Sequence, residues 1–328
     1  MNTSPTHAYH RYVINFGEMK LEEAGQWPDL LEIVEERVKP DRAHLTTNAI
    51  GRKRAENWWK FGGTSQSLHN AIRGLERVLV IACGATPYAS FTFVSANMVF
   101  AHSLAIIALF RTQSLTVMQS RPHELWARFF ASSMKDDMRY TPTDCFETFP
   151  FPENWEKSES LELAGKTYYE YRAALMVETN KGLTETYNDF HDPKCATPAI
   201  EKLRSLHACM DTAVLAAYGW PDIDTTCGFD LDYCDAEPAD DASPETLDRL
   251  ERGDYWFATA NEAKEFSFEL GEAAKRLPWR YRWRPEVRDD ILARLLLLNK
   301  DRAEAERQAG LSPLAATHDD LEDDDWDE

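Results

Sequence analysis

The pattern of apolar residues changes near Trp155, and this change constrains the fold more than any other feature of the sequence. Before it lie three apolar runs of strand length, separated by turn-forming or polar residues, at 77–83, 88–95 and 104–110. After it, apolar residues recur at helical spacing over three long segments, 159–180, 197–218 and 286–306. We therefore predict an α+β chain, in which a mixed, β-rich region is followed by a mainly helical one.

Shorter patterns complete this outline. The run YHRYVINF (9–16) is rich in β-branched and aromatic residues and predicts a strand. Residues 21–38 predict an amphipathic helix with Pro28 as a break, and residues 52–61 a short helix that ends at Gly62. Residues 114–131 predict a further helix, and 135–140 a short polar strand.

Composition limits the class of protein. Hydrophobic residues make up 43% of the 328-residue chain, enough for a sizeable core. No run of about 18 apolar residues occurs, so we expect no membrane span. The N-terminus shows no secretory signal, and the six cysteines form neither a C-x-x-C pair nor a finger-type spacing with histidines. We therefore expect a cytoplasmic protein with reduced thiols and no metal site.

The distribution of charge is more informative than its total. The formal net charge of −20 argues against a nucleic-acid partner when it is taken alone. Residues 50–140, however, contain eleven Lys and Arg against five Asp and Glu. Residues 141–328 contain twenty against forty-three, and eight of the twelve residues in the tail 317–328 are Asp or Glu. A mildly basic block thus lies inside an acidic chain, which is consistent either with nucleic-acid contact or with ordinary scatter of surface charge.

The motifs of several enzyme classes are missing. The sequence has no Asn/Asp-Pro-Pro-aromatic tetrapeptide, which amino-methyltransferases use to hold the target amino group. It also has no G-x-G turn after a strand, no P-loop, no H-E-x-x-H and no G-x-S-x-G. We therefore expect no catalytic residues and no cofactor in this chain, although an unfamiliar enzyme would also lack these motifs.

The segment KDDMRY (135–140) is the strongest local candidate for a site. On a strand, Lys135, Asp137 and Arg139 would project from one face and Met138 from the other. Lys and Arg can donate to guanine O6 and N7, and Asp can accept from cytosine N4. The segment is therefore a candidate for reading bases in a DNA groove, and the alternative is a solvated strand face with cross-strand ion pairs.

A basic helix start offers a second set of candidates. In GRKRAENWWKFG (51–62) we predict four phosphate-binding side chains: Arg52, Lys53, Arg54 and Lys60. Such contacts would set the register of a protein on DNA but would carry no sequence information. We expect Trp58 and Trp59 to lie in a core or a domain interface, and His123 to be a capping or hydrogen-bonded surface group.

Several strings occur in the same order as in a known family. They are RYVINFGEM (11–19), EERVKPDR (35–42), ENWWKFG (56–62), LERVLVIAC (75–83), the long segment 120–152 that ends in RYTPTDCFETFPFP, GLTETYNDFHDP (182–193), LHACMDTAVLAAYGW (206–220) and VRDDILARLLLLNKDRAEAE (287–306). In these strings the chain resembles the C-terminal half of MmeI-like type II restriction-modification enzymes, which are adenine-specific DNA methyltransferases. It is also similar to the methyltransferase proteins of the DISARM and BREX phage-defence systems.

The resemblance implies a domain order. Residues 1–44 would resemble the edge of a methyltransferase domain, 45–152 a target recognition domain and 153–308 a helical C-terminal domain, with a disordered acidic tail at 309–328. The family reads bases from the strand that matches KDDMRY, which again indicates Lys135, Asp137 and Arg139. S-adenosylmethionine would bind to a catalytic partner or a missing N-terminal half, and not to this chain.

The resemblance thus predicts a specificity subunit or fragment of an adenine-N6 DNA methyltransferase, with double-stranded DNA and a methyltransferase subunit or domain as partners. Three alternatives stay open at this point. The chain would otherwise be a non-functional fragment of a split gene, an acidic protein-interaction or DNA-mimic module, or an enzyme without familiar motifs.

Overall fold

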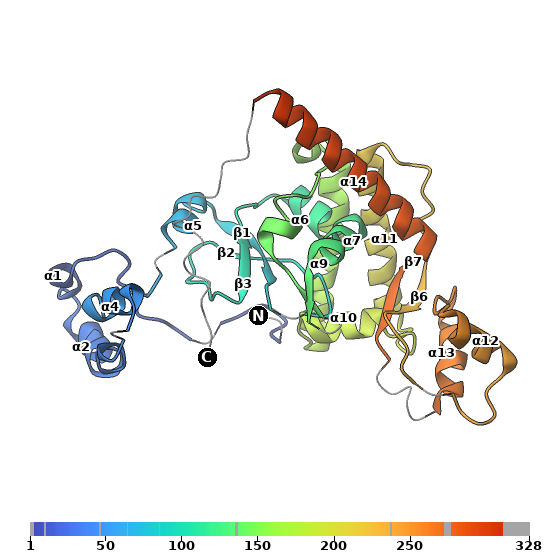
Figure 1. Cartoon of the computed structure of the whole chain (residues 1–328), viewed down its shortest axis with the longest axis horizontal. Coiled ribbons are helices and arrows are strands. Elements are labelled where there is room, and N and C mark those ends of the chain that lie inside the picture. The colour runs from blue at the N-terminus through green and yellow to red at the C-terminus, as the bar shows by residue number, and fades with distance from the viewer. Residues whose placement is uncertain are drawn as a thin grey trace. The chain divides into compact units, whose positions relative to one another are not determined.

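The computed structural model describes residues 3–9, 11–45, 47–63, 65–84, 86–134, 137–236, 238–271 and 277–310. The chain folds as two compact units (Figure 1), which we describe separately. The small unit is Tyr9–Gly74, and the large unit is Leu75–Leu311 together with Met1–Ala8. These units reflect packing within the chain, whereas the predicted boundaries at 44 and 152 follow the domain order of a family. Those boundaries therefore stay a prediction.

The small unit is a set of short helices around a small core. The helices are α1 (Leu21–Ala24), α2 (Pro28–Arg37), α3 (Lys39–Ala43), α4 (Ala49–Glu56) and α5 (Gln66–Ala71). The core consists of Phe16, Ala24, Val34 and Trp58, which confirms the expected burial of Trp58. The predicted helix over 21–38 is broken, because Pro28 begins a new helix at its first position.

The predicted strand at 9–16 is wrong for the residues that the structure describes there, which have no regular structure. Tyr12 is 90% exposed, whereas Phe16 belongs to the small core and Ile14 packs against it. A strand needs a neighbour for its backbone hydrogen bonds, and a β-type sequence alone does not supply one.

In the large unit, the first three strands form an antiparallel sheet. Strand β1 (Arg77–Ala82) lies between β2 (Thr92–Ser95) and β3 (Leu104–Ile107). All three strands fall within the predicted apolar runs. The middle four residues of β1 are buried, and Leu79 and Ile81 belong to the core that packs this sheet against the helices.

The predicted helix over 114–131 is two helices, α6 (Thr112–Gln119) and α7 (Arg121–Phe130). Ser120 lies between them with an extended backbone, φ −69° and ψ 157°, and Pro122 stands in the first turn of α7. Proline is accepted in the first turn of a helix, but inside a continuous helix its ring would clash with the carbonyl four residues earlier, so the helix breaks before Pro122. After α7 come β4 (Ser132–Met134), β5 (Asp137–Arg139) and α8 (Pro142–Cys145).

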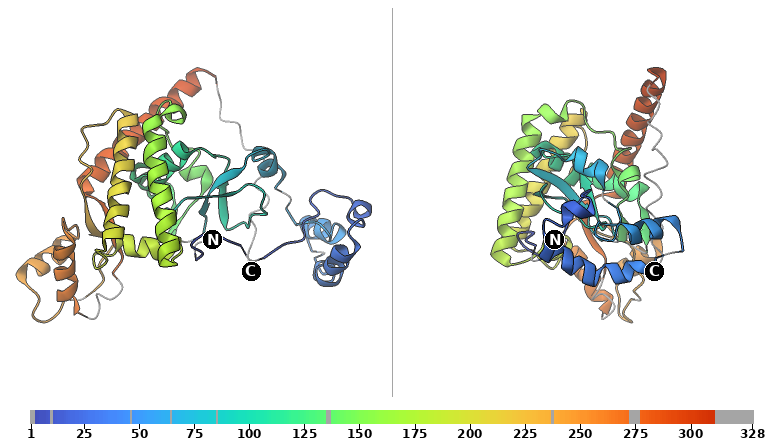
Figure 2. Two further views of the ribbon diagram at one scale, coloured as in Figure 1. Left: turned by 180° about the vertical axis from the view of Figure 1, so that it is seen from behind. Right: turned by 90° about the vertical axis from the view of Figure 1, so that its left-hand side faces the viewer.

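The C-terminal part of the large unit is mainly helical, as predicted (Figure 2). After a 3₁₀ turn at Trp155–Lys157 it contains α9 (Glu159–Thr179), α10 (Leu183–His191), α11 (Pro198–Tyr218), α12 (Pro244–Arg252), α13 (Ala260–Glu269) and α14 (Pro285–Gln308). Two strands, β6 (Cys227–Leu231) and β7 (Trp279–Trp283), pair in antiparallel fashion. The chain is therefore α+β, as the sequence predicts.

Helices α6 and α9 approach each other closely at one glycine. A Cβ on Gly165 would lie 1.9 Å from Thr116 Oγ1, and that hydroxyl donates to the carbonyl of Leu161 at 2.7 Å. Only glycine allows this contact. It fixes α6, and hence the start of α7, against the long helix α9.

In the part of the chain that the structure describes, no helix is both long and apolar enough to cross a membrane. The same described residues contain no group of three or more His, Cys, Asp or Glu side chains placed to hold a metal ion. The acidic residues 311–328 lie outside the described part, so the prediction for the tail is not tested.

Candidate nucleic-acid interface

Strand β5 holds two of the three predicted base-reading residues. It pairs with β4, Ser133 opposite Met138 and Ser132 opposite Arg139. On its other side, Met138 exchanges two backbone hydrogen bonds with Thr86, at 3.0 and 3.1 Å. Strand β5 is therefore held from both sides, between β4 and the segment that begins at Thr86.

The side chains of β5 alternate as the sequence predicts. Met138 is 3% exposed and belongs to the core of the sheet, whereas Arg139 is exposed and Asp137 half-buried. Arg139 lies close enough to Cys83, the residue that follows β1, for its charge to oppose the rise that burial causes in the pKa of the Cys83 thiol. Lys135 lies outside the described residues. The base-reading role of all three residues stays a prediction.

The predicted phosphate-binding residues lie on α4 and just after it. Asn48 caps this helix by accepting from Gly51 N at 2.6 Å. Arg52 and Lys53 are exposed on α4, while Arg54 is half-buried and packs against Gly62, where an added Cβ would lie 2.7 Å from its Nε.

Lys60 is engaged within the small unit. Its Nζ donates to the backbone carbonyl of Glu18 at 3.1 Å and lies 3.3 Å from the carboxylate of the same residue. It also lies over the ring of Trp59. Its geometry is thus that of a packing residue, and binding of phosphate by Lys60 would compete with these contacts. The phosphate-binding role of the four basic residues is untested.

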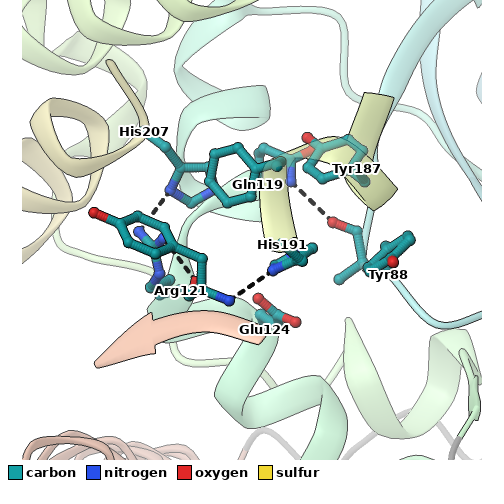
Figure 3. A pocket seen from close by; sticks show the side chains of 10 residues that line it. Tyr88, Gln119, Arg121, Glu124, Tyr187, His191 and His207 are labelled. Atoms are coloured by element: carbon teal, nitrogen blue, oxygen red, sulfur yellow. Dashed lines mark hydrogen bonds between the residues drawn. The ribbon is translucent and has the colours of Figure 1, made fainter. Parts of the chain in front are cut away.

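A buried ionic cluster lies where α7, α11 and β7 meet, and Figure 3 shows its members Arg121 and His207. Arg121 Nη1 donates to Asp211 Oδ2, and the backbone N of Arg121 donates to Asp211 Oδ1 at 2.9 Å. Nη1 also lies 2.9 Å from His207 Nδ1, and Nη2 donates to the carbonyl of Tyr281 at 3.1 Å. Burial alone would raise the pKa of Asp211, but the adjacent Arg121 and His207 hold it below its ordinary value.

A small enclosed cavity lies beside this cluster, lined by residues that include Tyr88, Gln119, Glu124 and His191 (Figure 3). Its volume is about 10 Å³, room for a single water molecule and for no cofactor or base. His191 Nδ1 accepts from the backbone N of Tyr281 at 2.9 Å. Burial, followed by the charge of Arg280, holds the pKa of His191 well below its ordinary value, so the imidazole is neutral. We interpret the cluster as structural.

A larger groove of about 690 Å³ lies along α12, α13 and the start of α14. Six carboxylate residues line it against two arginines, and Trp256 lies under Arg284 at 4.4 Å. Such an excess of negative charge repels phosphate, so we do not assign this groove to DNA.

Sequence reasoning overlooked one pair close to β5. Glu124 and Arg128, one turn apart on α7, form an ion pair at 2.9 Å. Arg128 Nη2 also donates to the carbonyl of Pro87 at 2.7 Å, and Pro87 directly follows Thr86. The i, i+4 spacing of opposite charges was a visible signal for the pair, but nothing local indicates its bond to Pro87.

The expectation that His123 lies on the surface is wrong. His123 is fully buried, with Nδ1 2.9 Å from the carbonyl of Met118 and Nε2 3.3 Å from that of Cys145. Burial lowers the pKa of His123 to about 4. Trp126 and Ala127 of the same helix are also fully buried, Ala127 in the core of the sheet and Trp126 in a second core that includes residues of α11 and α14.

Comparisons with known proteins agree with the sequence analysis. Residues 5–153 match the family model described as "MmeI, target recognition domain". DNA methyltransferase A of Bacillus subtilis (strain 168) is 26% identical over 211 residues, which cover 63% of this chain and 22% of the relative. The chain thus spans about a fifth of the length of that relative.

One solved structure also matches, the type IIL restriction-modification enzyme MmeI in complex with DNA. It is 20% identical to this chain, with a TM-score of 0.49, over 63% of this chain and 26% of that one. The family match includes α4, β4, β5 and the Glu124–Arg128 pair. Residues 5–153 of this chain are therefore similar to the target recognition domain of MmeI.

Proposed function

We propose that this chain recognises DNA sequence on behalf of an adenine-specific DNA methyltransferase of the restriction-modification or phage-defence type. The observation that carries the proposal is the match of residues 5–153 to a target recognition domain. Within that segment, β5 offers an exposed arginine on a strand fixed by the buried Met138.

In this proposal the base-reading residues are Lys135, Asp137 and Arg139. An exposed arginine fork matches guanine O6 and N7, and a neighbouring carboxylate accepts from cytosine N4. In the described part of the chain no ion pair engages the side chain of Arg139, so its donors are not already used by a carboxylate there. Each correct bidentate contact is worth about 1–3 kcal/mol of discrimination against the wrong base.

The small unit would anchor phosphates through Arg52 and Lys53, which are exposed on the capped helix α4. Such contacts add affinity for any DNA sequence and make binding depend on salt. Arg54 and Lys60 contribute less in this proposal, because both side chains already pack within the small unit.

Methyl transfer itself is assigned to another polypeptide or to a domain outside this sequence. That partner would bind S-adenosylmethionine and receive the flipped adenine, which needs a pocket of its own. In the described part of the large unit, the enclosed cavity of about 10 Å³ is too small for either molecule, and the groove of about 690 Å³ carries the excess of negative charge that argues against DNA.

The test is direct binding of the full chain to DNA. We expect fluorescence anisotropy to show binding of a labelled duplex, with an affinity that falls as salt rises, and repeated selection from a random duplex pool to enrich one motif. Arg139→Gln should alter the preferred base at one position of that motif. If the wild-type chain shows no affinity for DNA at low salt, the proposal is wrong and an acidic protein-interaction module becomes the better explanation.

A further inference from the structure

We infer that Glu124 and Arg128 of α7 position the reading strand β5, and that they do so through the segment Thr86–Phe91. The inference deepens the proposed function and rests on it. Neither residue lies on β5, and they would influence base preference without contacting DNA. We call Glu124, Arg128 and Pro87 the clamp.

The first step is the connection between the clamp and β5. Arg128 Nη2 donates to the carbonyl of Pro87 at 2.7 Å, and Thr86 precedes Pro87 in the chain. Thr86 exchanges two backbone hydrogen bonds with Met138, at 3.0 and 3.1 Å. Arg139 follows Met138 in the chain. The clamp is therefore connected to the backbone of the reading strand by consecutive covalent and hydrogen bonds.

The second step is that the clamp is fixed at its own end. Glu124 accepts from Arg128 Nε at 2.9 Å, and both side chains are about three-quarters covered. Burial alone would raise the pKa of Glu124, but Arg128, helped by Arg121 and Arg280, holds it below its ordinary value. Glu124 therefore stays ionised and orients the guanidinium toward Pro87.

The third step is that side chains outside the clamp hold residues 88–91 of the segment. Gln119 Nε2 donates to the carbonyl of Ala89 at 2.9 Å (Figure 3), and Gln119 Oε1 accepts from Phe91 N at 2.9 Å. Tyr88 Oη lies 2.8 Å from Asn188 Oδ1. These contacts fix residues 88–91, whereas Arg128 holds Pro87, the residue that follows Thr86.

Base reading requires accurate placement of the reading side chain, and the clamp contributes to that placement. Contacts with base edges depend on the placement of a side chain within about half an ångström. A strand of three residues has too few hydrogen bonds of its own to fix Arg139 so closely. The bridge to Thr86 supplies the second edge, and the clamp fixes that bridge.

The experiment is selection of duplexes from a random pool by the full-length chain and four variants. Arg128→Gln removes the ion pair and the donor to Pro87, and Arg128→Lys keeps the charge. Thr86→Val removes the hydroxyl that donates to the carbonyl of Tyr88 at 3.1 Å and keeps the shape of the side chain. Arg294→Gln is the control, because it removes a comparable ion pair on α14, at 2.8 Å from Asp222.

We expect the preference at one base pair, the same pair that Arg139→Gln affects, to fall about fivefold or more in Arg128→Gln and in Thr86→Val. Overall affinity should change by less than about threefold, since phosphate contacts remain. Arg128→Lys should recover most of the preference, and Arg294→Gln should match the wild type. A merely structural residue would lower the amount of folded protein without changing the preference of what remains.

Folding of each variant is checked by circular dichroism before selection. If Arg128→Gln does not fold, Glu124→Gln decides the question, because it removes the carboxylate that orients Arg128 toward Pro87. The inference is overturned if the folded variants select the wild-type motif with undiminished preference. If the wild-type chain itself selects no motif, the proposed function has failed. If the wild type selects a motif and the clamp variants select the same one equally well, the inference about the clamp has failed and the proposed function stands.

Discussion

Replacement of Asp211 by Asn tests whether the ionic cluster of the large unit is structural. Asp211 is fully buried and Arg121 is 4% exposed, so neither group has bulk water as an alternative partner. Asparagine keeps the shape of the side chain and one acceptor oxygen. Its amide nitrogen, however, faces either the guanidinium or the backbone N of Arg121, so a donor would meet a donor.

The structure sets the magnitude. Asp211 accepts from both the backbone and the guanidinium of Arg121, and Asp211→Asn leaves that buried cation without its counter-charge. Breaking one partner of a buried pair costs about 3–5 kcal/mol of unfolding free energy. The pair between Arg294 and Asp222 is exposed and screened by solvent, so it should contribute little to the free energy of unfolding. Asp222→Asn is therefore the matched control.

The assay is equilibrium unfolding in urea at pH 7, followed by far-ultraviolet circular dichroism. We expect Asp211→Asn to lower the unfolding midpoint markedly at an unchanged slope, and Asp222→Asn to leave it nearly unchanged. In the double variant Arg121→Met/Asp211→Leu the loss should be smaller than in Asp211→Asn, because no unpaired charge stays buried. A loss below about 1 kcal/mol in Asp211→Asn would refute the reasoning.

Three further outcomes are expected. Burial lowers the pKa of His123 to about 4, so protonation of this side chain favours the unfolded chain. The contribution of His123 to the free energy of unfolding should be full above about pH 6.5 and should fall by about 3 kcal/mol by pH 4. Urea unfolding across this range should show a steeper loss in the wild type than in His123→Gln. Lys53→Gln should weaken DNA binding about equally for all sequences and reduce the salt slope by about one, whereas Lys166→Gln, on an exposed part of α9, should not; a sequence-selective effect of Lys53→Gln would contradict phosphate contact. Met138→Ala should cost about 2–4 kcal/mol and lower base selectivity, and wild-type selectivity in the folded variant would argue against β5 as the reading strand.

The parts of the fold that local signals specify were predictable. Helices α9 and α11 begin at Ser158 and Thr197, whose hydroxyls accept from the backbone N of Leu161 and Ile200. Helix α11 ends at Gly219 with a φ of +77°, as the sequence indicates. The alternation of Asp137, Met138 and Arg139 likewise follows from the period of a strand.

The parts that depend on distant residues were not predictable. Strands β6 and β7 pair across nearly fifty residues, and the bond of Arg128 to Pro87 joins residues 41 positions apart. The run at 9–16 shows the converse error, because its residues suit a strand but no neighbouring strand pairs with them in the described structure. Local patterns thus located the candidate reading strand but not the residues that hold it in place.

Photo-crosslinking to the selected duplex tests the central claim, that strand β5 reads bases in the major groove. Thymines of the motif are replaced one at a time by 5-iodouracil, whose iodine occupies the major-groove position of the methyl group. Mass spectrometry then identifies the attached peptide. We expect crosslinks at one or two motif positions to peptides from residues 132–140, which should be lost when unlabelled motif competes. Crosslinks confined to peptides outside this segment, under conditions where the duplex is fully bound, would contradict the claim.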